Sequence, residues 1–255
     1  MNKFKSLIVL SLMLFVGGQV MGQTHGTMFL GVSIPAGDFA KGNELASTAL
    51  WGNEDQTYGG AAIGFNAGVK WDFGVGVKGL AVLLTVDGFF NGPSAAMQSC
   101  YQEKKEDLED GFENVELTIP KYINVPLMLG LRYSIYLNPQ FGIYAEGGAG
   151  ANVRFITDYT EHYVFNEQGA DIQVNHRNTW TYSADFAFAW QVGLGIEVSN
   201  KFVIGCSFYD LGPASVKGEV TYKSGSSGNF ISDISSFQNG QLHPMMILGR
   251  IGFRF

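Results

Sequence analysis

Apolar and polar side chains alternate with a period of two along most of the chain. In residues 63–73 (IGFNAGVKWDF) the odd positions are apolar, whereas the even positions are glycine or polar. The same alternation recurs in residues 27–34, 78–90, 123–135, 141–155, 182–198, 202–211 and 245–255. Because successive side chains of a strand point to opposite faces, this pattern predicts eight β-strands, each with one apolar and one polar face.

The predicted strands and their connections are typical of a membrane protein. Most of the strands have about 10 to 19 residues, whereas strands of soluble proteins usually have about 5–6. Three connections are tight turns near Gly74, Asn138 and Asn200, and four are long loops, residues 35–60, 91–118, 158–179 and 212–242. Short turns at one end and long loops at the other indicate an outer-membrane barrel with both termini in the periplasm. We therefore predict an all-β fold, an eight-stranded antiparallel up-and-down transmembrane β-barrel, closed because lipid cannot satisfy an open sheet edge.

The N-terminus has the pattern of a secretory signal peptide. Lys3 and Lys5 precede a ten-residue apolar run (LIVLSLMLFV), and Val20 and Gly22 fit the −3 and −1 positions of a cleavage site. The run is too short to span a bilayer as a helix. We predict a signal peptide at residues 1–22 and an outer-membrane β-barrel domain at residues 23–255, and removal of the peptide changes the net charge from −7 to −9.

The composition agrees with a lipid-facing exterior. The chain is 46% hydrophobic but only 15% charged, where soluble domains carry roughly 25% charge. The four long loops hold 17 acidic and 6 basic residues. Sixteen Lys and Arg residues against 23 acids, with no basic block, exclude nucleic acid as a partner.

Ionisable residues within the strands fall mostly on the polar face. They are Lys70, Asp87, Arg132, Glu146, Arg154, Asp185, Glu197, Arg250 and Arg254. A cation facing lipid near the midplane would cost about 2–4 kcal/mol, so we expect these groups to point inward and pair. Eight strands enclose a lumen just wide enough for side chains to fill, and no open pore is expected.

Aromatic residues gather at the ends of the predicted strands, where membrane–water interfaces should lie. Those next to the tight turns or the C-terminus are Trp71, Phe73, Tyr133, Phe141, Phe202, Phe253 and Phe255, and those near the long loops are Phe90, Phe155, Tyr182 and Phe208. Two aromatic belts are therefore predicted.

Four segments resemble known outer-membrane sequences. Residues 122–130 (YINVPLMLG), 31–39 (GVSIPAGDF) and 208–212 (FYDLG) resemble the PorT-like family of outer-membrane β-barrel domains, and the whole is similar to eight-stranded OmpA/OmpX-type barrels. The ending LGRIGFRF resembles the C-terminal signal that barrel-insertion machinery recognises, with Phe255 as its last residue. The resemblance implies the fold and the membrane and selects no single role, because members include secretion-apparatus accessories and adhesion-type barrels.

The long loops and the cysteines carry no recognisable reactive site. His162 and His176 share a loop with Asp158, Glu161, Glu167 and Asp171, but at spacings that match no metal-ligand pattern. The acidic run 103–116 lacks the ordered spacing of a calcium loop, so a solvated acidic loop is expected. Cys100 and Cys206 lie in unlike contexts, which favours two separate thiols over a disulfide. No catalytic, cofactor-binding or metal residue is predicted.

We predict a non-enzymatic integral outer-membrane protein, a scaffold that presents long extracellular loops for binding, adhesion or envelope assembly. The expected partners are outer-membrane lipid, the insertion machinery through Phe255, and an envelope protein. One alternative is a rim-active enzyme in which His243 acts beside Ser232, Asp233, Ser235 and Ser236. The others are a narrow channel through the lumen and a soluble barrel for a lipophilic ligand.

Overall fold

The computed structural model describes residues 24–42, 59–166, 173–226 and 229–255. The predicted signal peptide and its cleavage site lie outside the described residues. Within them, no helix is both long and apolar enough to cross a membrane.

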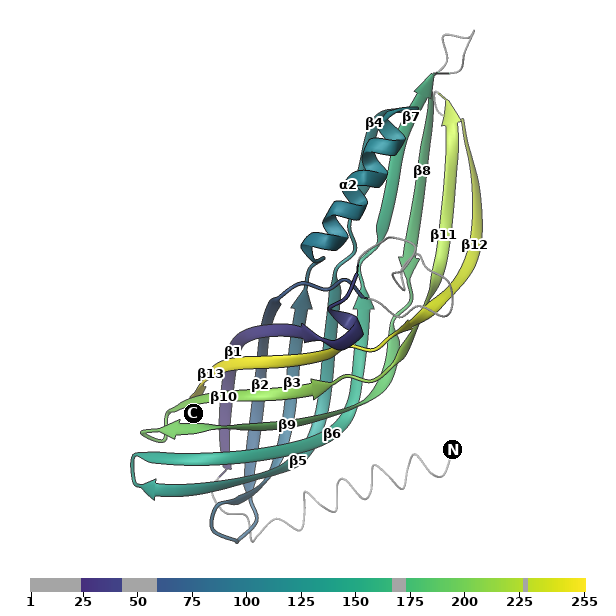
Figure 1. Cartoon of the computed structure of the whole chain (residues 1–255). Coiled ribbons are helices and arrows are strands. Elements are labelled where there is room, and N and C mark those ends of the chain that lie inside the picture. Colours follow the sequence, from purple (N-terminus) through teal and green to yellow (C-terminus); the bar gives the residue numbers. More distant parts are fainter. Residues whose placement is uncertain (1–23, 43–58, 167–172, 227–228) are drawn as a thin grey trace, which may run out of the picture.

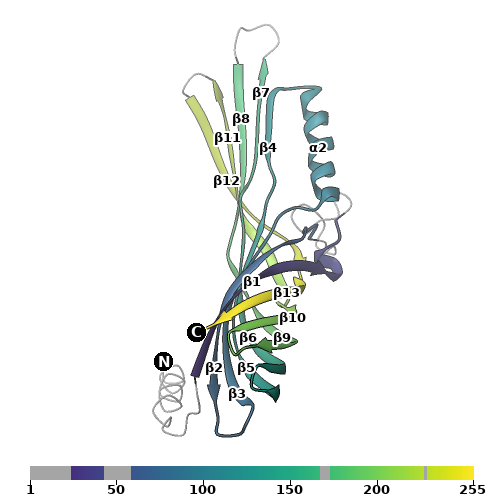
Figure 2. The same cartoon turned by 90° about the vertical axis from the view of Figure 1, so that its left-hand side faces the viewer.

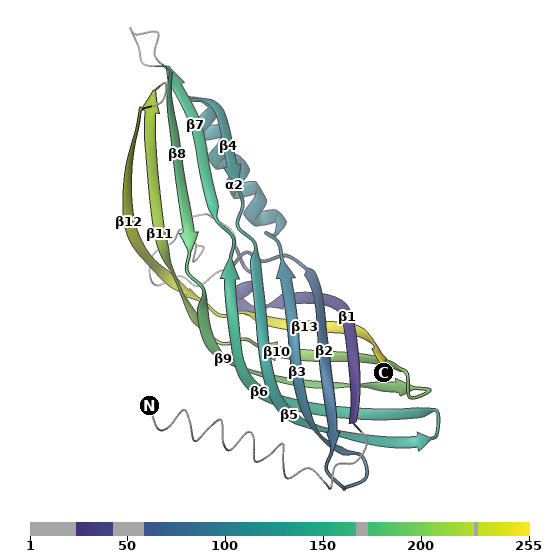
Figure 3. The same cartoon turned by 180° about the vertical axis from the view of Figure 1, so that it is seen from behind.

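Eight antiparallel strands close into a barrel, as the alternation predicts (Figures 1 and 3). Around the barrel they follow the order β1-β13-β10-β9-β6-β5-β3-β2. Their bounds are β1 Thr24–Ala36, β2 Gly64–Gly74, β3 Leu80–Asn91, β5 Tyr122–Asn138, β6 Phe141–Ile156, β9 Asp185–Val198, β10 Phe202–Asp210 and β13 Met245–Arg254. Since β1 pairs with both β2 and β13, the barrel has no open edge.

The outer face of the barrel is apolar and the inner face is polar. Outward side chains with large exposed areas include Leu30, Phe65, Leu129, Phe186, Phe188, Leu194 and Ile251. On the inner face, Lys70, Glu146 and Arg250 are buried. This inversion of the usual soluble pattern is the one predicted for a barrel with a lipid-facing exterior.

The three tight turns lie at one end of the barrel, here called the short-turn end. They connect β2 to β3, β5 to β6 and β9 to β10. The C-terminus and the start of β1 meet at the same end, where the backbone of Gly26 and that of Phe255 exchange two hydrogen bonds of 2.9 and 3.1 Å. The start of β1 and the C-terminal residue Phe255 therefore lie at the same end of the barrel.

The opposite end carries a second sheet, and the prediction of four long loops is wrong for most of their described residues. Five strands form this protruding sheet in the order β12-β11-β8-β7-β4 (Figure 1). They are β4 Glu113–Thr118, β7 Tyr159–Asn166, β8 Gln173–Tyr182, β11 Ala214–Ser226 and β12 Asn229–Leu242. Helix α2, Ala95–Glu109, lies beside β4, and a short 3-10 turn, η1, spans Gly37–Phe39 (Figure 2).

The protruding sheet is a continuation of barrel hairpins. Strand β6 ends at Ile156 and β7 begins at Tyr159; β8 ends at Tyr182 and β9 begins at Asp185. In the same way β10 leads into β11, and β12 leads into β13. At each short break the hairpin leaves the barrel and enters the protruding sheet. Beyond the break, polar side chains replace many of the apolar ones that cover the barrel exterior.

An apolar core lies where the two sheets meet. It includes Phe39, Phe89, Met97, Tyr122, Tyr159, Tyr182, Tyr209, Leu242 and Met246. Tyr182 is only 8% exposed in this core, so its predicted place in an outer aromatic belt is wrong. The strand predicted to begin at Tyr182 instead begins at Asp185, and Tyr182 ends β8.

Helix α2 takes up the first half of the predicted acidic loop at residues 103–116, and β4 begins within its second half. The Ser94 side chain accepts a hydrogen bond of 3.2 Å from the Met97 backbone N–H, which caps the first turn. Tyr101 on the buried side of the helix packs edge-on against Tyr159, with ring centroids 5.3 Å apart. The acidic side chains are therefore carried on a helix that is fixed to the sheet.

Candidate functional site

A charged network occupies the middle of the barrel lumen. Glu146 on β6 pairs with Lys70, and also accepts a hydrogen bond of 3.1 Å from Arg250 Nη2. Tyr209 donates a hydrogen bond of 2.5 Å to Asp87 Oδ2, and Arg250 Nη1 lies 3.5 Å from Asp87 Oδ1. Four of the charges predicted to point inward, Lys70, Asp87, Glu146 and Arg250, are thus brought together and paired.

A second group of four charges lies nearer the short-turn end. Arg132 contacts both Asp72, at 3.2 Å, and Glu197. Arg254 contacts the same two carboxylates, with Glu197 at 2.7 Å and Asp72 at 3.4 Å. Two cations and two anions therefore form a closed square, an arrangement that offsets the desolvation of each charge.

Two glycines make room for an aromatic ring between these groups. A Cβ atom at Gly195 or Gly205 would collide with the Tyr144 hydroxyl, so neither position admits a larger side chain. The freed space holds the Tyr144 ring, over which the Arg132 guanidinium sits at 3.7 Å from the centroid. The lumen is filled by side chains, as predicted for eight strands.

His162 and His176, predicted to lie in a loop, belong to β7 and β8, whereas His243 lies in the short connection between β12 and β13. His243 lies just before β13, and its Nε2 is 2.7 Å from Asp210 Oδ1 at the end of β10. The serines suggested as its companions, Ser232, Ser235 and Ser236, lie on β12 and pair in register with Lys223, Val220 and Glu219 of β11. The structure pairs His243 with Asp210 and holds these serines along the sheet.

His162 and His176 lie on neighbouring strands of the protruding sheet. His162 Nδ1 is 3.9 Å from Glu116, and the His176 ring stacks with Tyr163 and Phe165 at centroid distances of 5.3 and 5.1 Å. Burial lowers the pKa of His176 below its ordinary value of 6.5. No group of three or more His, Cys, Asp or Glu side chains that could hold a metal occurs among the described residues, and Glu167 and Asp171 lie outside them.

The two cysteines are not bonded to each other. Cys100 is buried on α2, whereas Cys206 is exposed on the outer face of β10.

Arg154 and Asp185, both predicted to face inward, are paired in register on β6 and β9. Arg154 Nη1 donates a 3.0 Å hydrogen bond to the Leu242 carbonyl. Arg154 therefore ties the barrel to the base of the protruding sheet, whereas the Asp185 side chain accepts a hydrogen bond from the Phe186 backbone N–H.

The two edges of the protruding sheet differ. Edge strand β4 has six residues, carries Glu113 and Glu116, and has α2 alongside. Edge strand β12 has 14 residues, which corresponds to roughly 46 Å of extended chain. It contains Asp233 as its single charge and neither proline nor lysine. Among the described residues no strand pairs with its outer edge.

Apolar side chains lie on both faces of this open edge. Ile231 is 80% exposed and Ile234 is 62% exposed, and the intervening Ser232 and Asp233 are also exposed. Natural proteins usually protect such an edge with lysine, proline, a bulge or a covering helix. The pairing of β12 with β11 shifts register between Gln238 and Gln241, at the base of the strand, whereas residues 229–238 pair without a shift. Residues 230–237 (FISDISSF) do not alternate between apolar and polar positions, and their polar composition favoured a loop.

The face of the sheet near β4 and β7 is already occupied by α2. Lys104 pairs with Glu161, which also accepts a hydrogen bond of 2.6 Å from the Tyr159 hydroxyl. Burial first, and the Glu161 carboxylate second, raise the pKa of Tyr159 well above its usual range. The open surface of the protruding sheet is therefore at β12.

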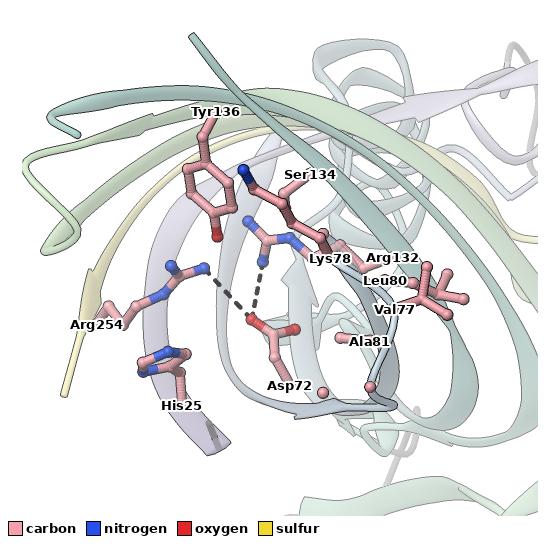
Figure 4. A pocket seen from close by; sticks show the side chains of 13 residues that line it. His25, Asp72, Val77, Lys78, Leu80, Ala81, Arg132, Ser134, Tyr136 and Arg254 are labelled. Atoms are coloured by element: carbon pink, nitrogen blue, oxygen red, sulfur yellow. Dashed lines mark hydrogen bonds and ion pairs between the residues drawn. The ribbon is translucent and has the colours of Figure 1, made fainter. Parts of the chain in front are cut away.

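A cavity of about 360 Å³ opens at the short-turn end of the barrel (Figure 4). Its lining includes His25, Lys78 and Tyr136 around Asp72 and the two arginines of the charge square. The hydroxyl of Tyr136, the ammonium group of Lys78 and the guanidinium group of Arg254 turn toward the same space (Figure 4). Lys78 was not recognisable from the sequence, because one lysine in a turn has no pattern.

Comparisons with known proteins give distant structural matches. No protein-family profile matches the sequence, so the resemblance to the PorT-like family stays a prediction, and no curated protein matches it. The crystal structure of Ail, the attachment invasion locus protein of Yersinia pestis, matches with a TM-score of 0.38 and 13% identity, over 92% of this chain and all of Ail. A major outer membrane protein from Thermus thermophilus matches with a TM-score of 0.44 and 11% identity, over 92% of this chain and all of that one.

The outer membrane protein OprG from Pseudomonas aeruginosa matches with a TM-score of 0.37 and 12% identity, over 91% of this chain and 95% of OprG. Likeness at this level carries no argument about function. The closed eight-stranded barrel rests on the strand pairing of this chain.

Proposed function

We propose that the chain is a non-enzymatic outer-membrane protein whose protruding sheet binds an extended segment of another protein. The segment would add to β12 as a further strand. The observation that carries the proposal is the outer edge of β12 over residues 229–238, with which no described strand pairs and which contains no lysine, proline or register shift.

Strand addition suits this edge because the backbone supplies the recognition. A row of unpaired N–H and C=O groups gives main-chain hydrogen bonds to any extended segment, and neighbouring side chains give selectivity. Ile231 and Ile234 offer apolar contact on either face, and only Asp233 could repel an acidic partner. The rigid barrel below would hold this edge clear of the membrane surface.

The proposed location in the outer membrane rests on the apolar exterior of the barrel. A ring of leucine, isoleucine, valine and phenylalanine side chains covers it, and the charges are paired inside. The proposal includes the signal peptide, the periplasmic position of both termini and recognition of Phe255 by insertion machinery. A soluble barrel would need the opposite distribution.

Selection of peptides against the protein in nanodiscs tests strand addition. A displayed library of extended peptides is selected on the wild-type protein, and binding of the selected peptides is compared with the Ile231→Lys/Ile234→Lys variant. We expect at least tenfold weaker binding to the variant, new hydrogen-exchange protection of β12 amides, and loss of binding when alternate peptide nitrogens are methylated.

The matched control is Tyr222→Lys, which places a cation on β11, one strand in from the edge, where the side chain is 42% exposed. We expect this change to reduce binding less than threefold. Peptides that bind the edge variant as well as the wild type, or that tolerate N-methylation on both backbone edges, would refute the proposal.

A further inference from the structure

We propose that the cavity at the short-turn end is a binding site for a phosphate group. This goes beyond the binding role of β12, because the cavity lies at the opposite end of the molecule. The site would be formed by Lys78, Tyr136, His25 and Arg254 over the charge square of the lumen.

The charges around the cavity leave one cation without a partner. Asp72 and Glu197 balance Arg132 and Arg254, since each carboxylate contacts both guanidinium groups. Lys78 forms no ion pair within the described part of the chain and is exposed at the mouth. The excess positive charge at this end of the lumen is therefore on Lys78.

The backbone holds Lys78 over the opening. The next residue, Gly79, has φ +83°, and its carbonyl accepts a hydrogen bond of 2.7 Å from the Ser134 N–H of β5. A Cβ atom at Gly79 would collide with the Ser134 carbonyl oxygen, so this close approach requires glycine. The turn between β2 and β3 is thus fastened to β5, which keeps the backbone of Lys78 at the mouth of the cavity.

The donors suit an oxyanion with several oxygens. Four polar groups line the cavity from different sides (Figure 4). They are an ammonium group, a phenolic hydroxyl, an imidazole and a guanidinium group. A planar carboxylate offers two oxygens, whereas a phosphate group offers three or four, and lysine and arginine are its usual partners. The acid in the lining, Asp72, is paired with both arginines through its Oδ2 atom.

The surroundings of the mouth favour an anion as well. The three turns at the short-turn end, residues 75–79, 139–140 and 199–201, contain Lys78 and Lys201 and no acidic residue. The acidic residues of α2 and β4 lie at the other end. The turns that a phosphate group would pass at this end therefore carry positive charge and no acidic side chain.

Titration of the folded protein with inorganic phosphate tests the site. In nanodiscs of phosphatidylcholine at constant ionic strength, we expect saturable shifts of the Gly76 and Gly79 amide resonances. Lys78→Gln should weaken binding at least fivefold, and Tyr136→Phe at least twofold. Lys201→Gln removes the same charge from a turn that does not line the cavity, and should change the affinity less than twofold.

Two further arms fix the ligand. Repeating the titration in phosphatidylglycerol nanodiscs asks whether the bound phosphate group belongs to a lipid. If it does, the amide shifts should be present before phosphate is added, and added phosphate should bind more weakly. If the phosphate group belongs to a soluble molecule, the affinity should equal that in phosphatidylcholine. Acetate should bind at least fivefold more weakly than phosphate. Equal affinity of the wild type and Lys78→Gln, equal affinity for acetate, or no saturable shift would overturn the proposal.

Discussion

The barrel and the protruding sheet are made from the same hairpins, yet their exposed apolar residues are arranged differently. In the barrel such residues form a continuous ring and every strand is paired on both sides. In the protruding sheet they are isolated among polar side chains, and β12 is left open in the described part of the chain. Leu129 and Ile234 have the same exposed fraction, 62%, so exposure alone does not tell which solvent a side chain faces.

The difference lies in closure and in what fills the opposite face. The barrel encloses paired charges, so its apolar side can only face outward. The protruding sheet buries aromatic residues beneath α2 and leaves the rest of its surface to water. Substitutions that affect the two regions unequally can break or sharpen this comparison.

The largest effect is expected inside the barrel. Glu146→Ala removes the carboxylate that pairs with Lys70 and Arg250, and leaves two buried cations without this partner. Loss of one member of a buried pair typically costs about 3–5 kcal/mol. We expect a loss of this size in denaturant unfolding of the folded barrel in lipid, followed by tryptophan fluorescence.

An equal loss on substituting Glu161, which pairs with Lys104 on the protruding sheet, would contradict this ranking. There the lysine keeps access to water, so its charge can be solvated when the partner is removed. Glu161→Ala also removes the acceptor of the buried Tyr159 hydroxyl, so we expect a loss of about 1–3 kcal/mol, smaller than that of Glu146→Ala.

The second prediction compares the same substitution in two environments. Leu129→Arg on the barrel exterior places a cation in lipid and should cost about 2–4 kcal/mol. Ile231→Arg, at a site that is 80% exposed on the protruding sheet, should change stability by less than about 0.5 kcal/mol. Unfolding of both variants in the same lipid gives the two values, and equal values would remove the distinction between the regions.

A smaller effect is expected at the start of α2. Ser94→Ala removes the hydrogen bond to the Met97 N–H and should destabilise the helix by about 1 kcal/mol. We expect faster hydrogen exchange in residues 95–100 and an unchanged barrel. Ser94→Asp, which restores a capping oxygen, should return the exchange rate to that of the wild type.

The smallest effect is a pH dependence at the far end of the sheet. The pKa of His176 is lowered by burial, so the unfolded state binds more protons than the folded state as the pH falls. Its contribution to stability is complete above pH 6.5 and is lost as the pH falls through the lowered pKa. Protease cleavage at the ends of β7 and β8 should rise over this interval, and His176→Phe should abolish the rise.

The barrel was predictable because lipid imposes a strict pattern. A strand that faces lipid must be apolar at every second position, so segments such as Leu127–Leu129–Leu131 identify themselves. The inward charges followed from the same constraint, and the structure pairs them.

The protruding sheet was not predictable in the same way, because water imposes no such pattern. Strand β8 reads QVNHRNTWTY, and its polar residues on both faces look like a loop. Helix α2 had a signal, the Ser94 cap followed by strong helix formers, which the acidic composition obscured. The cavity at Lys78 depends on strands distant in sequence, and no local pattern brings them together.

The central claim is that the exposed apolar ring of the barrel faces lipid, whereas the protruding sheet faces water. A nitroxide on native Cys206, in a Cys100→Ser background, and one on Ile231→Cys in a chain without other cysteines report the two environments. In vesicles, we predict that the Cys206 label is relaxed by oxygen and protected from a water-soluble nickel chelate, and that the Ile231→Cys label has the reverse preference. Equal access of the nickel chelate to both labels would contradict the account.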